Sequence, residues 1–124
     1  MKTWLRFATV ATIAAFTLVP LAARAQDAVK VAPGKFKVLF ENDQVRVLDY
    51  TAKAGEKLAM HSHPDHVIYN VSGGKTKFTT SDGKSQEMES KTGTATWVPA
   101  TTHSAEHHTA VHGILVELKK SGKK

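Results

Sequence analysis

The 124-residue sequence contains no cysteine. Disulfide bonds and thiolate metal sites are therefore both excluded. A small domain without disulfides depends on core packing or on a bound ion for its stability. A metal site in this chain would have only nitrogen and oxygen ligands.

Outside its first 25 residues the sequence also has no long apolar run. Within them, Lys2 and Arg6 precede an apolar stretch over residues 7–18, and small residues lead up to Ala25. This pattern is typical of a secretory signal peptide that is cleaved before Gln26. The apolar stretch is shorter than the roughly 20 residues that a membrane-spanning helix needs, which disfavours an uncleaved anchor. We expect a periplasmic or secreted protein of one small domain, with no membrane association after cleavage.

The chain has only a small excess of basic residues once this leader is set aside. The remaining residues include 14 lysines and arginines against 11 aspartates and glutamates. Four of the lysines lie in the tail over residues 119–124, and without them the net charge is near −1. A nucleic-acid interface needs basic residues clustered on one face with aromatic residues among them. We therefore expect no nucleic-acid partner.

No segment of sufficient length beyond the leader has the 3.6-residue period of a helix. Residues 26–35 are interpreted as an N-terminal arm with one possible short strand. Short runs of strand-forming residues then alternate with turn signals such as Asp82-Gly83, a strong hairpin cue. We expect an all-β antiparallel barrel or sandwich over residues 36–118, followed by a lysine-rich tail over residues 119–124. The nine expected strands cover residues 36–42, 45–52, 57–63, 67–71, 75–80, 85–89, 94–98, 103–107 and 112–118.

The stretch MHSHPDH, residues 60–66, contains three histidines within six positions. In an extended strand His61 and His63 lie on the same face, about 6.6 Å apart, so both can bind one ion. Such a pair also occurs by chance on protein surfaces. A further histidine, His103, follows shortly after Pro99 and strengthens the interpretation of a metal site.

Two stretches resemble the two sequence motifs of the cupin family. The first, GEKLAMHSHPDHVIYNVSG, covers residues 55–73, and the second, GTATWVPATTHSAEH, covers residues 93–107. The resemblance extends over nearly all of the chain beyond the leader and is to small single-domain bacterial cupins, some of them associated with β-alanine degradation. It implies a cupin-like antiparallel β-barrel, a jelly-roll type double-stranded β-helix. It also implies one divalent metal ion bound by His61, His63 and His103.

The glutamate ligand of the family motif has no exact counterpart in this chain. Six residues separate His66 from Gly73, as they separate the glutamate from the glycine in the family motif. Only two residues separate His66 from His63, however, where the family motif has three or four. An offset of three residues turns a side chain to the opposite face of a straight strand, although Pro64 can bend the chain there. Two interpretations stay open. His66 is a fourth metal ligand, or the more apolar face that includes Tyr69 is the interior one and His66 points outward.

The second stretch departs from the family motif as well. Thr101 stands where a glycine is usual, and His107 stands where an asparagine is usual. We expect His107, His108 and His112 to be surface or rim residues rather than ligands. Glu106 could bind the metal or orient an imidazole, although an exposed carboxylate is the simpler expectation.

Four other side chains carry weaker expectations. Tyr69 and Trp97 are expected in the core or in the wall of a pocket. Arg46 is expected to point outward, although it could hold a substrate carboxylate inside the barrel. Met60 neighbours His61 and is expected to face the other way.

Imidazole ligands alone do not distinguish among zinc, iron, manganese, nickel and copper. An open coordination position would favour an enzyme of the dioxygenase, isomerase or decarboxylase type, acting on a small carboxylated or enolic molecule. A closed four-histidine site would favour a non-catalytic periplasmic module that holds a metal or a small ligand. A third hypothesis is a copper-handling protein that also uses Met60 and Met88. The family resemblance further suggests a homodimer.

Overall fold

The computed structural model describes residues 26–120. The expected signal peptide over residues 1–25 and the last residues of the lysine-rich tail, 121–124, lie outside the described residues. Within residues 26–120 no helix is long and apolar enough to cross a membrane. This part of the chain forms ten strands and one short helix.

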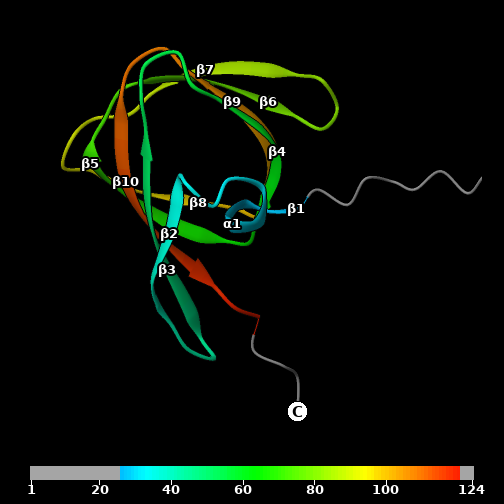
Figure 1. Cartoon of the computed structure of the whole chain (residues 1–124), viewed down its shortest axis with the longest axis vertical. Coiled ribbons are helices and arrows are strands. Elements are labelled where there is room, and N and C mark those ends of the chain that lie inside the picture. Colours follow the sequence, from blue (N-terminus) through cyan, green and yellow to red (C-terminus); the bar gives the residue numbers. More distant parts are fainter. Residues whose placement is uncertain (1–25, 121–124) are drawn as a thin grey trace, which may run out of the picture.

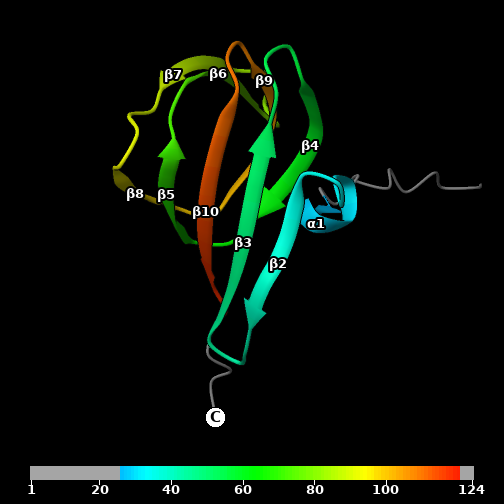
Figure 2. The ribbon, with the colours of Figure 1, turned by 60° about the vertical axis from the view of Figure 1, so that its left-hand side comes forward.

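The strands form two five-stranded sheets that face each other across a common interior (Figures 1 and 2). All strand pairs are antiparallel except that of β1 with β4. The expected antiparallel β-barrel is confirmed, and each of the nine expected strands is present to within two residues. The first sheet contains, in spatial order, β1 Gln26–Asp27, β4 Lys57–His63, β9 Thr101–His107, β6 Lys75–Thr80 and β7 Ser85–Glu89. The second contains β2 Phe36–Glu41, β3 Val45–Ala52, β10 Val111–Leu118, β5 His66–Ser72 and β8 Ala95–Val98.

The N-terminal arm includes a helix that the sequence did not predict. Helix α1, Ala28–Val31, has only four residues, too few for a helical period to appear in the sequence. Asp27 caps it by accepting a hydrogen bond from the Val29 amide at 2.9 Å. Ala28 is fully buried, and β1 pairs in parallel with β4, with Gln26 opposite His61. The arm is therefore packed against the barrel beside the strand that carries the first histidines.

Apolar side chains from both sheets fill part of the barrel interior. Leu48 on β3 and Leu115 on β10 are direct partners across the second sheet, and both are buried. Phe36 stacks on Tyr50 with ring centroids 4.4 Å apart. The rest of the interior is polar, with seven buried side chains of this kind: His61, His63, His66, Asn70, Thr76, His107 and Glu117. Buried polar side chains need partners, so this polar part of the interior is the place to look for a site.

The outer face of the second sheet carries a continuous apolar row. Successive strand pairs align five residues directly across the sheet: Phe40, Val47, Val116, Val67 and Trp97. The expectation that Trp97 and Tyr69 lie in the core or a pocket wall is wrong, because they are 53% and 47% exposed on this outer side. The large aromatic side chains of β5 and β8 therefore point outward, the reverse of what the hydrophobic pattern of the sequence predicts.

Replacing Leu48 tests the position of the core. Because Leu48 is fully buried, Leu48→Ala is expected to lower the free energy of unfolding by about 2–5 kcal/mol in denaturant titrations. Leu39→Ala is the matched control, since Leu39 is 52% exposed, and its effect should stay within about 0.5 kcal/mol. Equal losses for the two variants would contradict this assignment of the core.

Candidate metal centre

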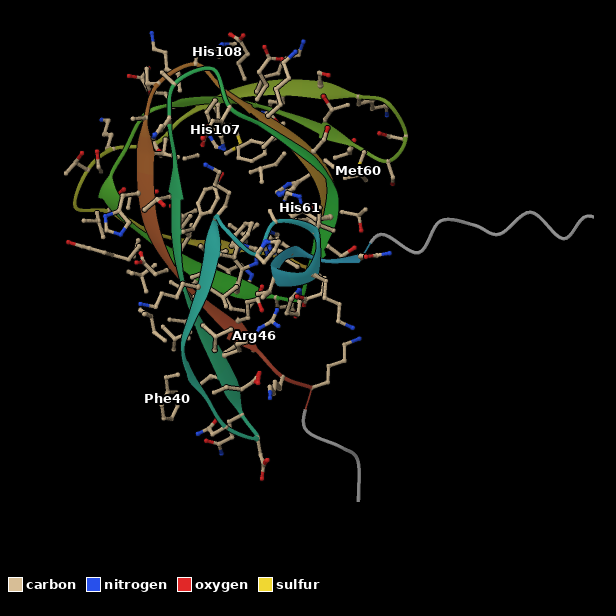
Figure 3. All side chains as sticks on the ribbon, viewed as in Figure 1. Phe40, Arg46, Met60, His61, His107 and His108 are labelled. Carbon is tan, nitrogen blue, oxygen red and sulfur yellow. The ribbon has the colours of Figure 1, made fainter. Side chains whose placement is uncertain are left out.

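His61 and His63 lie on the inner face of β4, as expected. The register of β4 against β9 shifts between Leu58 and His61, so that this strand contains a bulge. Leu58, His61 and His63 are all buried, whereas Met60 is exposed on the outside. Figure 3 shows Met60 outside the barrel and His61 inside it.

The pairing of β4 with β9 brings the third histidine to the same place. His103 is the direct cross-strand partner of His61, and their ring centroids lie 4.8 Å apart. The His63 and His103 ring centroids lie 5.5 Å apart. Each of the three imidazoles offers a nitrogen atom, and these nitrogens lie within 4.8 Å of one another. The structure thus brings together the three residues that the sequence had singled out from two distant stretches.

His66 also points into the barrel, but from the other sheet. The chain leaves the first sheet after His63 and enters β5 at His66, so Pro64 and Asp65 form the corner between the sheets. Strand parity therefore does not relate the directions of these two side chains, because His63 and His66 are on different strands. His66 is 4% exposed, and its ring centroid lies 5.1 Å from that of His63. The interpretation that Tyr69 points inward and His66 points outward is therefore wrong. His66 is not, however, one of the three histidines whose nitrogens lie within 4.8 Å of one another.

Hydrogen bonds fix the orientation of three of these imidazoles. The Nδ1 atoms of His61 and His66 lie 2.7 Å and 2.8 Å from the carbonyl oxygens of Ala59 and Pro64. The Nδ1 atom of His63 lies 2.9 Å from a carboxylate oxygen of Glu117. An Nδ1–H that donates to oxygen leaves Nε2 as the free lone pair of the ring. In all three rings the nitrogen able to bind a metal is therefore Nε2.

The ring of His103 is held by packing instead. It stacks on Phe78, with ring centroids 4.8 Å apart and an angle of 28° between the planes. It makes no hydrogen bond to any of the residues in 26–120. Both His103 nitrogens are thus free to bind a ligand.

Glu117, which orients His63, belongs to a buried ion network. Its other oxygen accepts hydrogen bonds from Arg46 Nε at 2.8 Å and from an Arg46 terminal nitrogen at 2.6 Å. The same terminal nitrogen lies 2.5 Å from a carboxylate oxygen of Asp27. The expectation of an outward Arg46 is wrong, because Arg46 pairs with Glu117 across the inner face of the second sheet. A carboxylate that holds the back of a metal-binding histidine is a common supporting feature of such sites.

Sequence reasoning did not identify Glu117 and considered Glu106 for this role instead. A signal was present in the last strand, because Gly113, Leu115 and Glu117 alternate on one face. An acidic residue on the inward face of an apolar strand needs a buried partner. That requirement would have linked Glu117 to an inward arginine.

Burial keeps His61, His66 and His103 uncharged. Desolvation, together with the neighbouring imidazoles of His61, His63 and His66, lowers the pKa of His103 to about 3. Desolvation also lowers the pKa of His61 and of His66. Desolvation alone would raise the pKa of Glu117, but hydrogen bonds from His63 and Arg46 outweigh it and lower that pKa. Neutral imidazoles supported by an ionised carboxylate are the protonation states that metal binding requires.

His107 forms a second polar group in the interior, and the expectation that it is a surface residue is wrong. It is 2% exposed and bonds Tyr50 Oη through Nε2 and Thr76 Oγ1 through Nδ1, the latter at 2.8 Å. His108 and His112 do lie on the surface side, paired with Glu87 at 3.2 Å and Asp49 at 2.6 Å.

A cavity of about 870 Å³ lies between the sheets. The rings of His61, His66 and His103 line it, and so does His107. Exposed residues of β7 such as Met88 also border it, so the cavity reaches solvent beside that edge strand. Its volume is in the range that small-molecule sites occupy.

No protein-family model and no curated protein matches this chain. Solved structures do match. A cupin domain protein of Bordetella pertussis superposes with a TM-score of 0.61 at 20% identity, over 77% of this chain and 97% of that one. An RmlC-like cupin of Methanocaldococcus jannaschii, described as a double-stranded β-helix, superposes with a TM-score of 0.52 at 16% identity, over 68% of this chain and 78% of that one. The chain has the cupin fold. A cupin superfamily protein of Desulfitobacterium hafniense has the same fold, with a TM-score of 0.54 at 16% identity, over 68% of this chain and 76% of that one.

The donor set of this cupin barrel fits a divalent metal ion. Three imidazoles converge from two strands, and hydrogen bonds or stacking hold each ring. Nitrogen ligands of this kind suit zinc and the first-row transition metals. The likeness to the solved cupins is one of fold, and the resemblance to cupins associated with β-alanine degradation stays a prediction.

The pKa of His103 predicts how the stability of the metal-free cupin barrel depends on pH. In the folded chain this pKa is about 3, against the ordinary 6.5 in the unfolded chain. The unfolded chain therefore binds an extra proton between these values, and the free energy of unfolding falls as the pH falls from 6.5 toward 3. For this one group the slope is up to about 1.4 kcal/mol per pH unit.

Denaturant titrations at several pH values in the presence of a chelator measure this slope. His103→Gln is expected to make it shallower, and His108→Gln, at a histidine with a 40% exposed side chain, should leave it as in the wild type. The same slope for wild type and His103→Gln would show that His103 is not the buried neutral group.

Proposed function

We propose that this chain binds one divalent metal ion inside its cupin barrel, through His61, His63 and His103. The observation that carries the proposal is the convergence of three imidazole nitrogens within 4.8 Å of one another. Their surroundings support it, because desolvation lowers the pKa of His61 and of His103, which keeps these two rings neutral, and Glu117 orients His63 from behind.

His66 is the residue that decides how many ligands the protein supplies. It is buried beside His63, with its Nε2 free. We propose it as a fourth donor that can approach from the opposite sheet. The ion is zinc, iron, manganese, nickel or copper, and these imidazoles do not select among them.

The cavity favours a role in small-molecule chemistry over a purely structural ion. A structural ion needs no adjoining space, whereas this site opens into about 870 Å³. A bound ion would act there as a Lewis acid or a redox centre. We propose a small carboxylated or enolic molecule as the ligand, and an activity of the dioxygenase, isomerase or decarboxylase type.

The alternative is a non-catalytic module that holds the metal or a small ligand. Export to the periplasm, predicted from residues 1–25, fits this alternative equally well. A copper-handling role has less support, because Met60 is exposed on the outer side of β4. The homodimer stays a prediction, and the outer apolar row with Phe40 and Trp97 is the surface through which two copies could pack.

Metal content tests the proposal directly. Protein purified without an affinity tag is expected to carry about one equivalent of a divalent metal, measured by elemental analysis. Each imidazole contributes a ligand, so His61→Ala and His103→Ala should lose most of it. His108→Ala is the matched control on the surface and should keep it. Full metal content in both ligand variants would refute the site, and His66→Ala separates three protein ligands from four.

Turnover distinguishes the enzyme from the binding module. Metal-loaded protein is assayed for oxygen uptake and for product formation with a panel of small diketones and carboxylates. Turnover that disappears in His103→Ala supports the enzyme. Binding of panel members without turnover supports the module.

The hydrogen bonds of Glu117 to His63 and Arg46 predict that a residue that is not itself a ligand also affects metal affinity, though less than a ligand does. Glu117→Gln keeps the shape of the side chain but removes the charge that holds His63 and Arg46. Metal affinity, measured by competition with a chromogenic chelator, is expected to fall about 10- to 100-fold. Asp49→Asn removes a carboxylate from the surface pair with His112 and serves as the control. An unchanged affinity in Glu117→Gln would show that the network does not support the ligand.

A further inference from the structure

Tyr50, His107 and Thr76 form a connected polar group in the cavity that the proposed metal site does not use. Tyr50 Oη pairs with His107 Nε2, and Thr76 Oγ1 lies 2.8 Å from His107 Nδ1. The three residues come from β3, β9 and β6, so both sheets contribute. All three are buried, and all three line the cavity.

A count of polar hydrogens shows that this group has one donor in excess. Desolvation lowers the pKa of His107 and raises that of Tyr50, so both are neutral near pH 7. A neutral imidazole has one N–H, and each hydroxyl has one O–H, which gives three hydrogens for two hydrogen bonds. One hydroxyl hydrogen is left over, and within residues 26–120 neither hydroxyl has a further hydrogen-bond partner.

Tyr50 is the hydroxyl that can deliver this hydrogen to a ligand. If Thr76 donates to His107 Nδ1 and His107 Nε2–H donates to Tyr50 Oη, the phenol hydrogen is free to point into the cavity. A phenol, with a pKa of about 10, is a stronger hydrogen-bond donor than an aliphatic hydroxyl. A ligand oxygen therefore favours the tautomer of His107 that leaves Tyr50 as the donor.

The group lies apart from the metal centre but in the same cavity. Phe36 stacks on Tyr50, and its ring centroid lies 5.8 Å from that of His61. Figure 3 shows His61 and His107 at different heights of the barrel, with His107 nearer the end that carries His108. Apolar side chains such as Leu58 and Leu115 line the cavity along with the two polar groups.

We propose that Tyr50, His107 and Thr76 form a carbonyl-binding subsite, in which the Tyr50 hydroxyl donates one hydrogen bond to a neutral ligand oxygen. The proposal deepens and rests on the proposed function, since it describes the molecule that would sit between this subsite and the histidine cluster. That molecule is small, has a ketone, ester or amide oxygen at one end and a metal-binding group at the other, and is apolar between them. A carboxylate at the Tyr50 end is disfavoured, because the three residues supply no positive charge.

Two probes of matched shape test the subsite without use of the metal. Cyclohexanone has the acceptor oxygen, and methylenecyclohexane replaces it with a methylene group. Their affinities for the protein are measured by NMR titration, before and after removal of metal with a chelator. Tyr50→Phe is expected to weaken cyclohexanone binding about two- to tenfold, the effect of one neutral hydrogen bond. Its effect on methylenecyclohexane should stay within about twofold.

Tyr69→Phe is the matched control, because it removes a phenol hydroxyl from the exposed face of the second sheet. It should change neither affinity. Equal losses for both probes in Tyr50→Phe, or no loss for either, would overturn the subsite. The carbonyl stretch of bound cyclohexanone in the wild type gives a second measurement that needs no variant. A frequency below that in hexane is expected, and a hexane-like frequency overturns the proposal.

The failure of this proposal can be told apart from the failure of the metal site. The difference between wild type and Tyr50→Phe should persist after chelation, because the Tyr50 hydroxyl and its partners His107 and Thr76 do not include a proposed metal ligand. Metal content is measured on the same samples. Tyr50→Phe should retain its metal. His61→Ala should lose the metal but keep the preference for cyclohexanone over methylenecyclohexane that the Tyr50 hydroxyl creates.

Discussion

The register between β4 and β9 is the constraint on which the site depends. It places His61 directly opposite His103, although the two residues are 42 positions apart in the sequence. A shift of one residue would turn the His103 side chain to the outside of the barrel. The bulge in β4 then sets which residues of that strand face inward, so that His61 and His63 both join His103. Backbone hydrogen bonds, rather than contacts among the imidazoles, therefore assemble the cluster.

Polar side chains occupy part of the barrel interior that an apolar core would otherwise fill. Buried histidines and an inward Glu117 replace the aliphatic side chains that would otherwise fill the space between the sheets. Each such group costs free energy unless it has a partner, and the structure supplies one by hydrogen bonding or by ion pairing. Among residues 26–120 no side-chain nitrogen or oxygen atom that is itself fully buried lacks a hydrogen-bond partner, and the free Nε2 atoms of His61 and His66 belong to rings that line the cavity. The polar interior is thus organised in advance of any ligand.

The strands and the facing of His61 and His63 were predictable because both depend on local pattern, whereas His103 was assigned to the same site through the resemblance to the cupin motifs. Short β-branched runs between turn residues marked the strands, and His-x-His put two rings on one face. The facing of β5 was not predictable, because Tyr69 and Val71 are more apolar than His66 and Asn70 but lie outside. The partners of Arg46 were hidden for a similar reason, since Asp27 and Glu117 approach it only in the folded chain. Pairing between strands that are distant in the sequence decides which way these side chains face and which partners they meet. The hydrophobicity of a single strand does not predict that pairing.

The short arm before the barrel is part of the support of the candidate ligands. Asp27 binds Arg46, Arg46 binds Glu117, and Glu117 holds the ring of His63. A chain shortened to begin at the first long strand would keep every imidazole and still lose the outermost link of this series. The expected cleavage point lies only two residues before that link. How much of this arm the chain keeps therefore matters for how firmly the centre of the barrel is held.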